Sequence, residues 1–200
     1  MKAFIFIISL LSATISVAQE RATGGGNIEV IEALVSERMS RGKLDFCEIT
    51  YLIGYEDYVY NQGAVTALRG SLSFAGFIEE KEKSPIVMFK VTAFNFDGKN
   101  FILAPLDYAY LSTTSDNYAG KEFVMGAAED GGLLVGYDAM SNMALPSQLS
   151  EKIYINIVKN GGRSDVSVPF SLLAIDAEKS LKYSDCSMRL LDGIIAKFQN

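Results

Sequence analysis

The residue types that most often carry out catalysis are scarce in this chain. It contains no histidine and two cysteines, Cys47 and Cys186. Without an imidazole there is no base for a serine or cysteine nucleophile and no histidine-ligated zinc site. The cysteines form no Cys-x-x-Cys motif, so thioredoxin-like exchange has no basis in the sequence either. We therefore expect a protein that is not an enzyme and needs no cofactor.

Acidic residues occur in neighbouring pairs, at Glu56-Asp57, Glu79-Glu80 and Glu129-Asp130. Hydrolysis by carboxylates requires two such groups on opposite sides of a cleft, which adjacent residues on a turn do not supply. A histidine-free carboxylate hydrolase is thus the most remote of the functions considered. Two loops contain oxygen ligands that calcium could use, one with Asp116 and Asn117 and the other with Glu129, Asp130 and Asp138. Neither loop has the ligand spacing of an EF-hand. The sequence predicts no metal site.

Residues 1–18 have the features of a cleavable secretory signal. A basic start at Lys2 precedes an apolar run over 3–11, and the small residues Ser16-Val17-Ala18 suit a signal peptidase. We expect cleavage near Ala18 and a periplasmic or secreted mature protein. No later stretch is long and apolar enough to predict a transmembrane anchor.

The exported chain is expected to be acidic and cross-linked. The whole chain has a formal net charge of −6, and Lys2 is the only charged residue of the expected signal. That sign repels nucleic acid and anionic lipid, so the expected partner is an unidentified protein or envelope component. Because a periplasmic or extracellular compartment is oxidising, Cys47 and Cys186 are predicted to form a disulfide.

Apolar residues fall on every second position through much of the chain, which is typical of half-buried strands. Ile153, Ile155 and Ile157 share one face of a strand, and Gly161-Gly162 turns the chain into a second strand that ends at Phe170. Similar patterns occur at 44–52, 54–63, 65–78, 86–96, 101–103, 108–111, 123–125 and 133–137. The strand at 86–96 is apolar on both faces, which favours a mainly β fold, an antiparallel β-sandwich or a partly open barrel.

Helices are expected at both ends of this β region. Helical spacing predicts an N-terminal helix over 28–40, with its apolar stripe formed by Ile28, Ile31, Leu34, Val35 and Met39. The same spacing predicts a C-terminal helix over 181–198 after a helical segment at 171–178, and a short helix is expected within 139–149. With a flexible lead-in at 19–26, residues 27–200 are interpreted as a single β-rich domain.

Between residues 101 and 178 the chain has, in order, Ala104-Pro105-Leu106 before a tyrosine-rich strand, Phe123, a turn at Asp130-Gly131-Gly132, and Val166 to Ala174. This order resembles the invasion-associated locus B-like exported proteins, in which a Pro-Leu strand, a Gly-Cys hairpin and a strand ending in Ser-Leu-x-Gly-Phe follow one another. Here Gly131-Gly132 stands in place of Gly-Cys, so the family's second-half disulfide would be absent. The resemblance implies a small all-β periplasmic protein with no established catalytic residues.

The leading functional hypothesis is a non-enzymatic envelope or secreted protein that binds a protein or a surface component. It depends on the expected export, the acidic charge and the missing catalytic groups. Tyrosines with polar neighbours suit a contact surface, and the candidates are Tyr51, Tyr55, Tyr58, Tyr60, Tyr108 and Tyr110. The alternative is a carrier that holds a small apolar ligand in a cavity between the sheets or in a barrel mouth.

Overall fold

We describe the protein from a computed structural model that defines residues 25–40, 42–76, 85–142, 144–149 and 151–198. In these residues the strands form a large sheet with the order β1-β2-β3-β4-β8-β7, in which β5 also pairs with β4, and a small sheet with the order β10-β9-β6. The strands are β1 (Gly25–Ser40), β2 (Lys43–Asp57), β3 (Ala64–Ala75), β4 (Ile86–Phe96), β5 (Phe101–Ala104), β6 (Leu106–Ser112), β7 (Val124–Ala127), β8 (Leu133–Asp138), β9 (Ile153–Lys159) and β10 (Val166–Phe170). The expected signal peptide at 1–18 and residues 19–24 of the expected lead-in lie outside the described residues.

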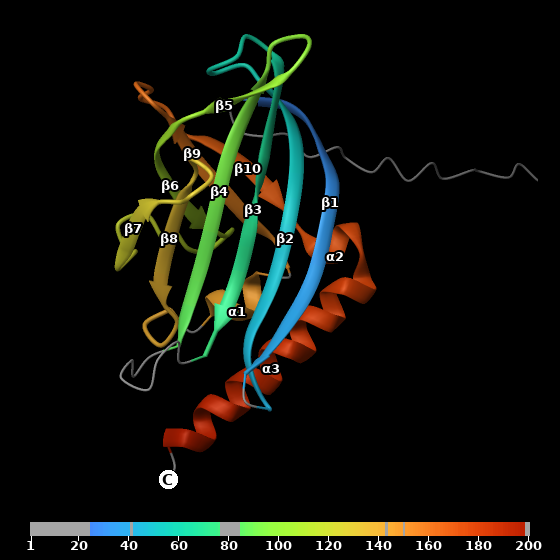
Figure 1. Ribbon diagram of the computed structural model, residues 1–200, viewed down its shortest axis with the longest axis vertical. Coiled ribbons are helices and arrows are strands. Elements are labelled where there is room, and N and C mark those ends of the chain that lie inside the picture. Colours follow the sequence, from blue (N-terminus) through green and yellow to red (C-terminus); the bar gives the residue numbers. More distant parts are fainter. Residues whose placement is uncertain (1–24, 41, 77–84, 143, 150, 199–200) are drawn as a thin grey trace, which may run out of the picture.

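The two sheets pack face to face, as the alternating apolar pattern predicts. Every strand pairing among the described residues is antiparallel. The inward rows of β2, β4 and β9 join one hydrophobic cluster that also includes side chains of the C-terminal helix. This arrangement confirms the mainly β, antiparallel sandwich class. Figure 1 shows the long strands β1 to β4 side by side, with β9 and β10 behind them.

The predicted N-terminal helix over 28–40 is wrong, because these residues form the long strand β1. β1 pairs with β2 from Gly25 to Ser40, with a register shift between Val30 and Glu32. A bulge of this kind changes which side chains face the core, so an alternating pattern imitates helical spacing. Three members of the supposed helical stripe are in fact exposed, namely Ile31, Leu34 and Met39.

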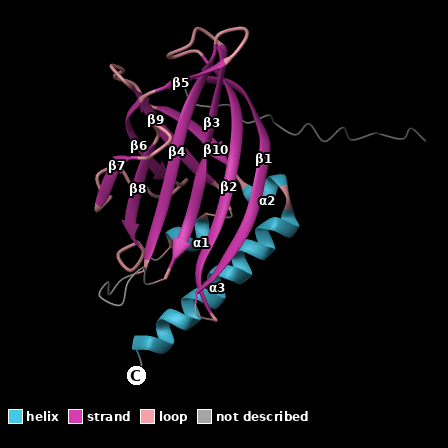
Figure 2. Cartoon of the chain, viewed as in Figure 1, coloured by secondary structure: helices cyan, strands magenta, loops and turns pink. Residues whose placement is uncertain are grey.

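The predicted C-terminal helix is confirmed as α3 (Ala177–Phe198), which follows two short helices, α1 (Leu145–Gln148) and α2 (Leu172–Ile175). Figure 2 shows α3 crossing the sheet near one end of the strands. Its buried face carries Tyr183, Cys186, Leu190 and Ile194, which recur at helical spacing. Cys186 is joined to Cys47 of β2 by a disulfide with a Cα–Cα distance of 6.0 Å. The cross-link predicted from the sequence therefore connects α3 to the large sheet.

Gly70 allows two strands and a tyrosine to approach one another closely. The Tyr51 hydroxyl donates to the Lys90 carbonyl oxygen (2.9 Å), and Gly70 lies between these strands because it pairs with both Tyr51 and Val91. A Cβ at Gly70 would lie 1.9 Å from the Lys90 oxygen and 2.7 Å from the Tyr51 hydroxyl. No side chain larger than hydrogen fits there without a backbone shift.

We expect Gly70→Ala to lower the free energy of unfolding by about 1–3 kcal/mol, the usual cost of overpacking. Urea denaturation monitored by circular dichroism would measure the change. Gly126→Ala is the matched control, because Gly126 also lies in a strand but a Cβ there would meet nothing within 4 Å. Equal losses in both variants would contradict the close-approach argument.

Candidate functional site

Four polar side chains meet in the interior at one end of the sandwich. Asp57 ends the inward row of β2, and Thr66 begins that of β3. Asn95 continues the inward row of β4, and Lys159 ends that of β9. Because alternate side chains of a strand share a face, each polar group is aimed at the same interior as the apolar residues beside it. We call these four residues the Lys159 cluster.

The ammonium group of Lys159 makes three hydrogen bonds within this cluster. Its Nζ donates to Asp57 Oδ2 (2.6 Å), Asn95 Oδ1 (2.6 Å) and Thr66 Oγ1 (2.9 Å). The side chains of Lys159 and Asp57 are 7% and 0% exposed, respectively. Charges this deeply buried are tolerated only when they are paired and hydrogen-bonded. The cluster thereby holds the small sheet against three strands of the large sheet.

Asp57 is itself fixed in place by the chain that follows β2. Its Oδ1 accepts hydrogen bonds from the backbone N–H groups of Val59 (3.1 Å) and Tyr60 (2.9 Å). The Tyr55 hydroxyl donates a hydrogen bond to Asp57 Oδ2 (3.4 Å). The pKa of Tyr55 is raised, mainly by burial and secondly by the negative charge of Asp57. Burial also lowers the pKa of Lys159, because desolvation disfavours the ammonium, although Asp57 opposes the shift.

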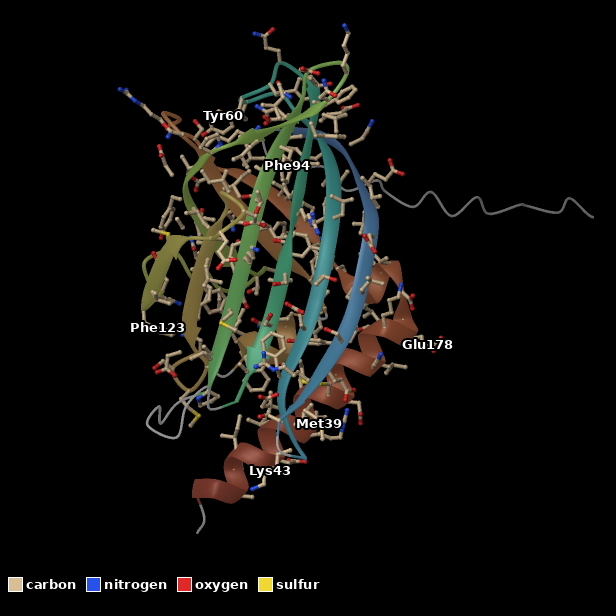
Figure 3. The ribbon with its side chains drawn as sticks, viewed as in Figure 1. Met39, Lys43, Tyr60, Phe94, Phe123 and Glu178 are labelled. Atoms are coloured by element: carbon tan, nitrogen blue, oxygen red, sulfur yellow. A yellow bond between two sulfur atoms is a disulfide. The ribbon has the colours of Figure 1, made fainter. Side chains whose placement is uncertain are left out.

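Tyr60 covers the cluster from the turn after β2. The Nζ atom of Lys159 lies 5.7 Å from the centroid of the Tyr60 ring, and the Tyr60 hydroxyl donates to the Ser164 carbonyl oxygen. Figure 3 places Tyr60 at the opposite end of the molecule from Met39 and Lys43, which flank the β1–β2 turn. The cluster and the disulfide therefore lie at opposite ends of the sandwich.

Sequence reasoning missed the Lys159 cluster, although a signal was present. The row Ile153, Ile155 and Ile157 continues with Lys159, and the row that contains Tyr55 continues with Asp57. A polar residue at the next inward position of several rows indicates a buried polar site rather than the end of the buried face. Chemically, the site brings an amine, a carboxylate and a carboxamide into contact where little water enters.

The predicted contact surface of six tyrosines is not a single exposed surface. Tyr51 and Tyr55 are only 2% and 1% exposed, because they belong to the inward row of β2. Tyr110 is also buried, Tyr60 and Tyr108 are half-buried, and Tyr58 alone of the six is exposed. The alternation that makes β2 a strand is the physical reason for this correction.

Tyr108 and Tyr110 do lie together, with ring centroids 5.6 Å apart. Carboxylates engage both hydroxyls, since Tyr108 donates to Glu122 Oε1 (2.5 Å) and Tyr110 donates to Asp165 Oδ2 (2.5 Å). Burial and the bond to Asp165 raise the pKa of Tyr110 to about 12. Burial and the bond to Glu122 likewise raise the pKa of Tyr108. This pair is better described as a connection between β6 and its neighbouring loops than as a free binding surface.

A different part of the molecule has exposed apolar side chains on neighbouring strands, along the border of the large sheet beyond β4. β8 pairs with β4 over residues 86–91, and β5 continues along the same border over residues 93–96. Leu103 of β5 lies against Gly131 in the turn between β7 and β8. We call this region the β7 border, and its exposed apolar residues are Phe101, Ile102, Leu103, Phe123, Val124, Met125 and Leu134. Figure 3 shows Phe123 at the side of the sandwich, away from α3.

The loop residues considered as possible calcium ligands do not gather into a site in the part of the chain that the structure describes. Among the described residues, no three histidine, cysteine or carboxylate side chains come close enough together to hold a metal ion. Asp130 pairs with Lys90 (3.0 Å), and Asp138 accepts hydrogen bonds within its own loop from Met140 N and the Ser141 hydroxyl.

No helix in the described part of the chain is long and apolar enough to span a membrane.

Comparison with known proteins adds no assignment, since no protein-family model, curated protein or solved structure matches this chain. The resemblance to the invasion-associated locus B-like proteins therefore remains an expectation from short motifs.

Proposed function

We propose that this protein acts after export as a non-enzymatic binding protein, and that it receives an extended segment of a protein partner at the β7 border. The observation that carries this proposal is the exposure of seven apolar side chains on β5, β8, β7 and the residue before β7. Exposed apolar patches on a folded protein commonly mark interaction sites. The expected signal peptide and the disulfide support a location outside the cytoplasm.

The two terminal strands of the large sheet differ in how they are protected. β1 carries charged residues along its length and has three register shifts. It is also partly covered by α3, because Arg189 pairs with Glu37 (2.7 Å) and Lys182 Nζ donates to the Val35 carbonyl oxygen (3.4 Å). Charges, bulges and covering elements are the usual means of preventing unwanted strand pairing.

β7 has none of these protections among its own residues. The segment Phe123 to Ala128 contains neither a charged residue nor a proline, and all four residues of β7 are exposed. An edge of this kind can add a further strand through backbone hydrogen bonds, while apolar side chains select the sequence that binds. The chemistry therefore favours an uncharged, extended peptide segment as the occupant.

The test is to substitute lysine for Met125, which is 40% exposed in the middle of β7. We expect Met125→Lys to weaken partner capture at least about tenfold, because a lysine on an edge strand opposes strand addition. The tagged, exported protein would be used to capture partners from an envelope extract, and bound proteins would be quantified by mass spectrometry. Peptides from the captured partner would then be titrated against the purified protein.

Leu181→Lys is the matched control, because Leu181 is 71% exposed on α3, away from β7. Capture lost in Met125→Lys but retained in Leu181→Lys supports the proposal. Equal capture by Met125→Lys and the unchanged protein would refute it. A dimer that dissociates in Met125→Lys would instead identify a second copy of this chain as the occupant of the edge, and so replace the proposed partner.

A further inference from the structure

The Lys159 cluster contains the three groups that an amide-forming reaction requires. Lys159 supplies a primary amine, Asn95 a carboxamide, and Asp57 a carboxylate that can take up and return a proton. The amine contacts both partners at 2.6 Å. A lysine becomes a nucleophile when its surroundings favour the neutral amine, and a neighbouring base assists that change.

The surroundings of the amine favour this chemistry. Lys159 is 5% exposed, with the Tyr60 ring beside it. Burial lowers the pKa of Lys159, which favours the neutral amine. Holding the reacting groups together on rigid strands can replace a collision in solution by a reaction of very high effective concentration.

We propose that Lys159 and Asn95 become joined by an intramolecular isopeptide bond, with Asp57 acting as general base and then general acid. The bond would connect β9 of the small sheet to β4 of the large sheet. It would lie at the opposite end of the sandwich from the Cys47–Cys186 disulfide, so that a covalent link would fasten each end.

The reaction needs no oxidant and no further reactant. The Lys159 ammonium first transfers a proton to Asp57, and the free electron pair of Nζ then attacks Cγ of Asn95 to form the new C–N bond. Thr66 can donate to Asn95 Oδ1 (3.0 Å), which stabilises charge on that oxygen. A second proton passes from Nζ through Asp57 to Nδ2, the Cγ–Nδ2 bond breaks, and ammonia leaves. The remaining proton stays on Asp57 or departs with ammonia as ammonium.

Intact mass spectrometry of the full, folded chain after reduction of the disulfide tests this proposal. Loss of ammonia is expected to lower the mass by about 17 Da relative to the sequence with its measured N-terminus. Trypsin should then yield a branched peptide in which residues 91–99 are joined to residues 153–163, because cleavage after Lys159 is blocked. A measured mass equal to the full sequence mass, in a protein shown to be folded by circular dichroism, would overturn the proposal.

Lys159→Arg keeps the positive charge and its hydrogen-bond donors but is expected to have the full sequence mass. Lys99→Arg, which alters a lysine in the exposed turn after β4, is expected to retain the loss. A loss that persists in Lys159→Arg would come from another group, such as a cyclised N-terminal glutamine, and would contradict the proposal. A loss of about 18 Da would indicate release of water from Asp57 instead, and would overturn the role of Asn95.

Discussion

Replacing Cys47 and Cys186 together by alanine is expected to lower the free energy of unfolding by about 5 kcal/mol at 25 °C on the chain-entropy model. The disulfide connects residues separated by 139 positions, so it closes a long loop and removes much of the freedom of the unfolded chain. It also fastens α3, whose inward face packs on β2. Guanidinium denaturation of the oxidised protein and of the double variant would measure the difference.

Reduction of the unchanged protein is the matched control for this experiment. It breaks the cross-link but keeps both side chains, which are completely buried. The reduced protein should therefore lose most of the stability that the double variant loses. The difference between the two losses measures the cost of the cavity left by the missing sulfur atoms. Equal denaturation midpoints for the oxidised and reduced proteins would show that the long loop is already constrained when unfolded.

Asp57→Ala is expected to lower the free energy of unfolding by about 3–5 kcal/mol, because it leaves the Lys159 ammonium buried without its counter-charge. The variant also removes the acceptor for the backbone N–H groups of Val59 and Tyr60. Chemical denaturation would measure the loss, and the intact mass of each protein would show separately whether Lys159 is cross-linked.

The double variant Asp57→Leu with Lys159→Met is the control that separates charge from packing. Replacing both members of a buried ion pair by apolar residues is often neutral or stabilising. We therefore expect the double variant to be more stable than Asp57→Ala, because neither protein can form the proposed Lys159–Asn95 bond and only Asp57→Ala leaves a buried charge unpaired. Comparable losses in both proteins would mean that the hydrogen bonds of Asp57 to the turn, and not its charge, dominate.

Local sequence patterns are sufficient for much of the fold. The inward row of β2 and the Ile153 to Ile157 row predict strands because only one conformation places every second side chain on a common face. The apolar stripe of α3 predicts its helix for the equivalent reason at a period of about 3.6. The disulfide was also predicted from the sequence, because export was expected and the two cysteines have only each other as partners within the chain.

The errors arise where pairing between strands decides the outcome. The segment over 28–40 fits a helical period, but its long pairing with β2 and a bulge make it a strand. Tyr51 and Tyr55 are suitable residues for a contact surface, yet their positions in the inward row bury them. Propensity is a weak guide in such cases, because tertiary packing outweighs it.

Local patterns in the chain correctly predict the shared faces of β2 and β9, the C-terminal helix and the cysteine pair. The contact of Lys159 with Asp57 and Asn95, and the place of β7 at the end of the large sheet, are properties of the fold. The difference arises because a side chain's orientation depends mainly on its neighbours in the chain. Its contacts depend on residues about 60 to 100 positions away, which fold topology brings together.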